Sequence, residues 1–145
     1  MPEVRHFTDR LKRVLAATRD HAAAQGAQTI EAQHILAAIA REGEGVAAVV
    51  LENLGVRLGD LDSALARRAV RGDARLRKWD LPYGGGAKRA IDRAVREAAG
   101  LGHAWVGPEH LLLALAVESG TIAAGVLASF GITADRVRSE ILKLV

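Results

Sequence analysis

The chain has 145 residues, of which 50% are hydrophobic and only 3% aromatic, and it contains no cysteine. A chain of this length forms one domain or two very small ones with a real core, and the lack of cysteine excludes a disulfide framework and thiol chemistry. Its formal charge of +3 is too small an excess to indicate a partner until the basic residues are located along the chain.

Alanine is abundant and proline is limited to three residues, a composition that favours closely packed helices over a sheet of β-branched and aromatic side chains. The amino terminus lacks the apolar core of a signal peptide. The longest apolar run, 111–117, is far below the roughly 20 residues that span a bilayer. We therefore expect a helical protein with a cytoplasmic location and no membrane segment.

The sequence contains an internal repeat. In one ungapped alignment Phe7 falls on Tyr83, and glycines, histidines and apolar stripes then recur at matching positions. These pairs include Gly26 with Gly102, His34 with His110, and Gly55 with Gly131. Chance similarity between alanine-rich helices would not place glycines and histidines at matching positions, so duplication is the better explanation. We place repeat one at 7–65, a connector at 66–82 and repeat two at 83–145, all within a single domain, 1–145.

Each repeat is expected to form four helices. The first follows Phe7 and carries an inward stripe at helical spacing, formed by Leu11, Val14, Leu15, Thr18 and Ala22. The second helix starts near Glu31 or at Pro108, and the third covers about 46–54 or 122–130. The fourth presents Leu58, Leu61 and Leu65 in one copy and Val137 and Ile141 in the other. The expected fold is therefore all-α, with two pseudo-twofold-related four-helix repeats joined by a basic connector.

The basic residues gather in the connector, which contains six of them against Asp73 and Asp80, for a local charge of +4. The rest of the chain holds 14 basic and 15 acidic residues. The six are Arg67, Arg68, Arg71, Arg75, Arg77 and Lys78. With Trp79 available for stacking, they are candidates for binding a polyanion or nucleic acid. Arginine-rich loops are more often solvated or paired with nearby carboxylates, so nucleic acid is the weaker alternative.

Three short motifs follow one another along the chain. Residues 7–10 read Phe-Thr-Asp-Arg and are followed by Val14 and Leu15. Residues 107–112 read Gly-Pro-Glu-His-Leu-Leu, with a weaker counterpart at 31–36, and the Glu-Gly-Glu-Gly-Val-Ala-Ala of 42–48 has a counterpart at 118–124. Together they resemble the amino-terminal double-repeat domain of the Clp family of AAA+ unfoldases, most closely its ClpC branch, from about residue 5 to 145.

This resemblance implies a non-catalytic binding module without a cofactor. Its expected partners are a Clp-type AAA+ ATPase and the adaptor or substrate proteins of that ATPase. As a free-standing chain it would act in trans, as a monomer. In the ClpC branch the domain also recognises phosphorylated arginine, through the threonine of the opening motif and the glutamate before the histidine. The first copy holds Thr8 and Gln33 at these positions and the second holds Gly84 and Glu109, so each pocket is expected to be half retained.

A second surface is implied by the same resemblance. In the family, a shallow apolar groove formed by the amino-terminal tip and the start of the second repeat receives adaptors. The matching positions here are Val4, Tyr83, Lys88 and Asp92. The alternative is that Val4 and Tyr83 only close the seam between the repeats, and the sequence favours neither.

Catalytic and metal motifs are weak in this sequence. His34 and His110 lack the i, i+4 partner of a zinc helix, and we expect them to be partly buried histidines near helix starts. The glycine-rich stretch at 84–89 lacks the spacing of a phosphate-binding loop, and no Gly-x-Ser-x-Gly elbow is present. We therefore expect no enzyme activity and no metal site.

Overall fold

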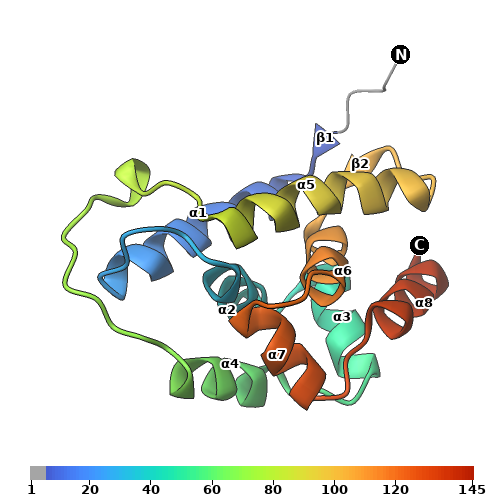
Figure 1. The fold of residues 1–145 in the computed structure, drawn as a ribbon. Coiled ribbons are helices and arrows are strands. Elements are labelled where there is room, and N and C mark those ends of the chain that lie inside the picture. Colours follow the sequence, from blue (N-terminus) through green and yellow to red (C-terminus); the bar gives the residue numbers. More distant parts are fainter. Residues whose placement is uncertain (1–5) are drawn as a thin grey trace.

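The computed structural model describes residues 6–145, which contain eight α-helices, four in each repeat (Figure 1). The first repeat contains β1 (His6–Phe7), α1 (Asp9–Ala24), α2 (Ala32–Glu42), α3 (Gly45–Asn53) and α4 (Leu58–Arg67). A 3-10 turn, η1 (Lys78–Asp80), then precedes α5 (Gly85–Gly100), β2 (Trp105–Val106), α6 (Pro108–Val117), α7 (Ile122–Ser129) and α8 (Ala134–Leu144). The expected helices are confirmed, with boundaries that shift by a residue or two.

Threonines begin three of these helices. The hydroxyls of Thr8, Thr121 and Thr133 accept hydrogen bonds from backbone N–H groups in the first turns of α1, α7 and α8, at 3.0 to 3.2 Å. Each hydroxyl satisfies a donor that has no partner inside its helix. The position of Thr8 is therefore fixed by helix capping, whatever else its side chain contacts.

The second helix of each repeat lies at the centre of the core. Eight residues of α2 and eight of α6 are buried, so both helices are covered on nearly all sides. Figure 1 shows α1 and α5 on one side of this central pair and α3, α4, α7 and α8 on the other. The core is aliphatic and rich in alanine, and small side chains let α1 and α5 approach α2 and α6 closely.

The helix contacts come in matched pairs that join the two repeats. Within the repeats α1 packs on α2 as α5 packs on α6, and α4 packs on α2 as α8 packs on α6. Between the repeats α3 contacts α6 and α8, while α7 contacts α2 and α4. Each repeat therefore buries its third helix against the other repeat, and the two share one core.

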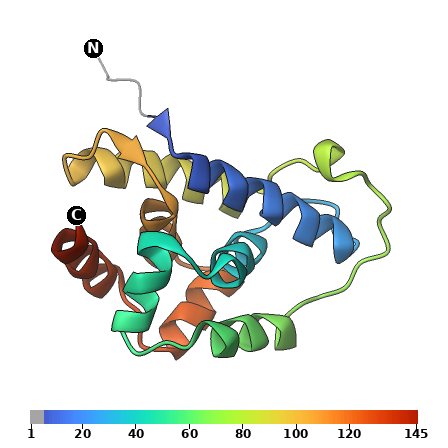
Figure 2. The ribbon, with the colours of Figure 1, turned by 180° about the vertical axis from the view of Figure 1, so that it is seen from behind.

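Short strand pairings also cross between the repeats. The strand β1 pairs in parallel with β2, with Phe7 opposite Val106. The two strands lie side by side in the view from behind (Figure 2). A single bridge joins Ile30 to Tyr83 at the matching place on the other side. The segment that opens each repeat is thus held by the segment that precedes the second helix of the other repeat.

No single helix within residues 6–145 is long and apolar enough to cross a membrane. By length and composition α6 and α7 pass that test only as a pair, and they are bent by 92° where they meet.

The connector follows a long path past the carboxyl end of α1 (Figure 1). It is held by backbone hydrogen bonds from Gly72 to Gln25 and from Ala74 to Gly26, at 2.9 and 3.0 Å. Arg19 of α1 donates to the carbonyl oxygens of Lys78 and Leu81 at 3.0 and 2.9 Å. These contacts attach the connector to repeat one, so it is not a free tether.

We expect Arg19→Ala to loosen the connector and to lower the free energy of unfolding by about 1–3 kcal/mol. The guanidinium makes two hydrogen bonds to carbonyl oxygens and lies 4.9 Å from the ring centroid of Tyr83 and 5.7 Å from that of Trp79. Limited trypsin digestion, followed by mass spectrometry, should show faster cleavage after the connector arginines. Arg96→Ala, at an exposed position of α5, is the matched control and should be cleaved at the wild-type rate.

Candidate functional site

Two equivalent junctions lie where the repeats exchange backbone hydrogen bonds. At the first, the N–H of Thr8 donates to the carbonyl oxygen of Val106 at 3.0 Å, and Glu109 follows in the first turn of α6. At the second, the N–H of Gly84 donates to the carbonyl oxygen of Ile30 at 2.8 Å, and Gln33 follows in the first turn of α2.

The pairing of the phosphoarginine candidates therefore differs from the expectation. The sequence grouped Thr8 with Gln33 and Gly84 with Glu109, one pair in each copy. The crossed strand pairing instead places Thr8 beside the segment that leads to Glu109, and Gly84 beside the segment that leads to Gln33. The first junction thus has both expected residue types, and the second has neither.

The carboxylate of Glu109 is 5% exposed and already has a partner. The indole N–H of Trp105 donates to its Oε2 at 3.3 Å, and the carboxylate folds back over Gly107, where a Cβ would collide with it. At the second junction the carboxylate of Glu31 takes the corresponding place against Gly84 and accepts a hydrogen bond from the Thr29 hydroxyl. Sequence reasoning missed Glu31 because nothing in its local pattern places it against a residue of the other repeat.

The two repeated histidines cap helices. Nδ1 of His34 accepts a hydrogen bond from the N–H of Glu31, and Nδ1 of His110 accepts one from the N–H of Gly107, both at 2.9 Å. The rings are 3% and 0% exposed, more deeply buried than expected. Burial, followed by the neighbouring His21 or His103, lowers each pKa from 6.5 to about 4. In residues 6–145 no group of three or more His, Cys, Asp or Glu side chains is placed to hold a metal ion.

The candidate adaptor groove is described only in part. Val4 lies outside the described residues. Tyr83 is half-buried, packs against the core and faces Arg19, so it takes part in the seam between the repeats. Lys88 and Asp92 are exposed and lie one turn apart on α5. Tyr83 thus packs at the seam and Lys88 and Asp92 lie at the surface, while adaptor binding at these residues stays a prediction.

The connector arginines lie at the surface. Arg67, Arg68, Arg71, Arg75 and Arg77 are exposed, while Lys78 is half-buried and pairs with Asp20 at 2.9 Å. Arg77 pairs with Asp80 at 3.1 Å, and Trp79 is 67% exposed. The glycines at 84–86 cap and open α5 directly, so they do not form a loop between a strand and a helix.

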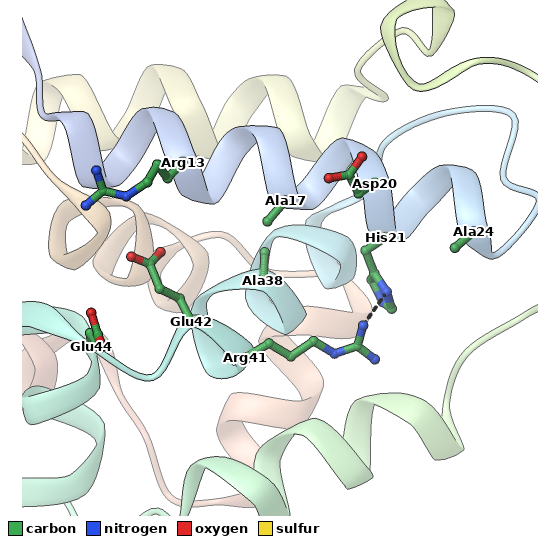
Figure 3. A pocket seen from close by; sticks show the side chains of 9 residues that line it. All are labelled: Arg13, Ala17, Asp20, His21, Ala24, Ala38, Arg41, Glu42 and Glu44. Atoms are coloured by element: carbon green, nitrogen blue, oxygen red, sulfur yellow. Dashed lines mark hydrogen bonds between the residues drawn. The ribbon is translucent and has the colours of Figure 1, made fainter.

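A pocket that the sequence did not indicate lies between α1 and α2 (Figure 3). It has a volume of about 690 Å³, and its lining residues are Arg13, Ala17, Asp20, His21, Ala24, Ala38, Arg41, Glu42 and Glu44. Arg41 bridges its edge, with Nη1 at 2.9 Å from Nδ1 of His21 and Nε donating to Asp62 at 2.9 Å. Burial, and then the charge of Arg41, lower the pKa of His21.

Comparison with known proteins identifies the fold and the family. The family described as the Clp repeat (R) N-terminal domain matches residues 6–119 and 85–145. The chain is 35% identical over 139 residues to the "Negative regulator of genetic competence ClpC/MecB" of Bacillus subtilis and 34% identical to the chaperone protein ClpB of Oceanobacillus iheyensis. Each match covers 96% of this chain but only 17% of the relative, so the chain spans about a sixth of the length of these curated proteins.

Solved structures show the same fold. The Hsp104 N-terminal domain from Candida albicans matches with a TM-score of 0.80 at 16% identity, over 97% of this chain and 91% of that one. The N-terminal domain of ClpD from Arabidopsis thaliana matches with a TM-score of 0.72 at 21% identity, over 95% and 93%. The paired four-helix repeats, the crossed strands and the sequence matches together show that this chain belongs to the Clp N-terminal domain family.

Proposed function

We propose that this chain is a non-catalytic protein-binding module that recognises substrates, degrons or adaptors for a Clp-type ATP-dependent unfoldase in the cytoplasm. The observation that carries the proposal is the family match over nearly the whole chain, which covers only a sixth of relatives that are themselves Clp chaperones. As a free-standing domain the chain would act in trans, as an adaptor or a decoy. A Clp-type ATPase is its proposed partner.

Within this function, the first junction is the better candidate for phosphoarginine. Glu109 would pair with the guanidinium through charge-assisted hydrogen bonds, and Thr8 would help to hold the phosphate. The indole N–H of Trp105 now occupies one oxygen of Glu109, so an incoming guanidinium competes with it. At the second junction Gly84 has no hydroxyl, and Glu31 places a carboxylate where a phosphate would approach.

Isothermal titration with free phosphoarginine tests the first junction. We expect wild-type protein to bind and Glu109→Gln to weaken binding by about ten- to hundredfold, since hydrogen bonds between charged groups contribute about 1.5–3 kcal/mol. Trp105→Phe should strengthen binding because it removes the competing donor. Glu52→Gln, at an exposed position of α3, removes the same charge elsewhere and should bind as wild type. Equal affinities for wild type and Glu109→Gln would contradict this assignment, whether or not the domain binds protein.

Polyanion binding through the connector is a second candidate, favoured by its five exposed arginines. It is the weaker one, because Arg77 and Lys78 already face carboxylates. An electrophoretic mobility shift of labelled single-stranded DNA at low ionic strength tests it. Retardation that disappears when Arg67, Arg68, Arg71 and Arg75 become alanine would support it, and no retardation of DNA by wild-type protein would exclude it.

A further inference from the structure

A chain of hydrogen bonds runs from the start of α2 to the pocket between α1 and α2. It begins at the backbone N–H of Glu31, which lies 2.9 Å from Nδ1 of His34. Nε2 of His34 lies 3.1 Å from Oε1 of Gln25, and Nε2 of Gln25 lies 3.2 Å from Nε2 of His21. Nδ1 of His21 then lies 2.9 Å from Nη1 of Arg41 at the edge of the pocket.

The direction of each bond follows from the first donor. A backbone N–H can only donate, so Nδ1 of His34 accepts and its ring proton is on Nε2. That proton goes to Oε1 of Gln25, which leaves the amide N–H₂ to donate to Nε2 of His21. Neutral His21 therefore carries its proton on Nδ1, and this N–H points at a guanidinium N–H that can also only donate.

Neither turning the Gln25 amide nor moving the His21 proton removes this conflict. Turning the Gln25 amide over would require His34 to accept at both ring nitrogens, which only an imidazole anion can do. Moving the His21 proton to Nε2 would place it against the Gln25 N–H₂, inside the protein. One contact between two donors is therefore left, and at the His21–Arg41 end an acceptor can enter from the pocket.

The second repeat is built differently at the matching place. Nδ1 of His110 accepts from Gly107, and its Nε2–H can donate to Nδ1 of His103 at 2.8 Å. The repeat alignment places Leu101 where the first repeat has Gln25 and Val117 where it has Arg41. The amide and the arginine are therefore features of the first repeat alone, beyond what helix capping requires.

We propose that the His21–Arg41 end of this chain is a binding site for an oxyanion, a carboxylate or phosphate group of a ligand that enters the pocket between α1 and α2. One oxygen would accept from Nδ1 of His21 and another from the guanidinium of Arg41, which replaces a contact between two donors by two favourable hydrogen bonds. Asp62 is engaged on the Nε side of Arg41 and would keep the guanidinium at the edge of the pocket.

Three carboxylates, Asp20, Glu42 and Glu44, also line this pocket, and each is paired with a basic side chain, Lys78 or Arg10. A second hollow of about 460 Å³ shares His21, Ala24 and Arg41 with the first and adds Arg71 of the connector, a further cation. Ala17, Ala24 and Ala38 also line the first pocket, and their small side chains leave room beside the charged groups. The site lies about 20 Å along α1 from Thr8, since thirteen residues of helix separate them, so it is distinct from both junctions.

The test is a pair of charge-matched substitutions read by nuclear magnetic resonance. Long-range ¹⁵N–¹H spectra of the imidazoles at pH 7.5 should show the proton on Nδ1 in His21 and on Nε2 in His34. Gln25→Glu offers an acceptor to both histidines, so the His21 proton should move to Nε2 and Nδ1 should then accept from Arg41. Gln28→Glu adds the same charge at an exposed position nearby and should leave both tautomers unchanged.

Titrations with inorganic phosphate and with sodium acetate, each at constant ionic strength, complete the test. We expect a saturable shift of the His21 resonances in wild type, an affinity at least about tenfold weaker in Gln25→Glu and a change below about twofold in Gln28→Glu. Saturation by phosphate alone identifies a phosphate site, and saturation by acetate identifies a carboxylate site. A wild-type His21 with its proton on Nε2, or linear shifts with both ions, would overturn the proposal. Neither result bears on phosphoarginine binding at Glu109.

Discussion

Lowering the pH from 7 to 4 should reduce the free energy of unfolding by about 3 kcal/mol for each of the two capping histidines. The pKa of His34 and of His110 is lowered from 6.5 to about 4, chiefly by burial. Between these values the unfolded chain binds protons that the folded protein does not, so stability falls as the pH falls. Well above pH 6.5 both states carry neutral histidines, and this contribution is constant.

Urea denaturation as a function of pH measures this effect, and a double substitution isolates it. Glutamine at the third helical position can accept the same backbone hydrogen bond without titrating, as in a capping box. His34→Gln/His110→Gln should therefore lose the part of the pH dependence that corresponds to about two protons, while carboxylate titration is common to both proteins. An unchanged slope between pH 4 and 6.5 would show that these histidines are protonated alike in the folded and unfolded states.

We expect Gly26→Ala to destabilise the protein by about 2–5 kcal/mol and to detach the connector. Gly26 ends α1 with φ of 69°, a conformation that costs an alanine roughly 1–2 kcal/mol. A Cβ there would also collide with the backbone of Gly72, and forcing atoms into a packed contact typically costs a further 1–3 kcal/mol. Connector amides, measured by hydrogen exchange, should lose protection in this variant.

Gly102→Ala is the matched control, because the repeat alignment pairs Gly102 with Gly26. Gly102 has a similar φ of 77°, yet a Cβ there would meet nothing within 4 Å. In this variant the free energy of unfolding should fall only by the cost of placing alanine at this φ, roughly 1–2 kcal/mol. The connector amides should stay protected from hydrogen exchange. Equal losses in the two variants would mean that the contact between Gly26 and Gly72 does not hold the connector.

Much of the fold could be predicted from the local spacing of apolar residues and glycines. Four residues of the expected stripe, Leu11, Val14, Thr18 and Ala22, are buried and the fifth, Leu15, is half-buried. The glycines at 26, 55, 102 and 131 mark helix ends. The fourth helix, α4, continues to Arg67, two residues into the predicted connector. Helices and their ends depend on neighbouring residues, which a single sequence shows directly.

The site residues were harder to predict from the sequence, because their contacts depend on which distant segments pack together in the fold. The repeat suggested that each copy builds its own pocket, but the crossed strands join Thr8 to the segment before Glu109. Glu31 faces Gly84 of the other repeat, and no local motif reports such a contact. His21, Gln25 and Arg41 are spread over α1, the following turn and α2, and only the fold brings them into one hydrogen-bond chain.

The central claim is that this domain binds polypeptides, and one titration tests it most directly. Fluorescence anisotropy of labelled casein, an unfolded protein, would be measured with increasing amounts of the domain, using casein with and without phosphorylated arginines. We expect saturable binding of at least one form, tighter for phosphorylated casein and weakened by Glu109→Gln but not by Glu52→Gln. No saturable binding of either form would contradict the account of this chain as a polypeptide-binding module.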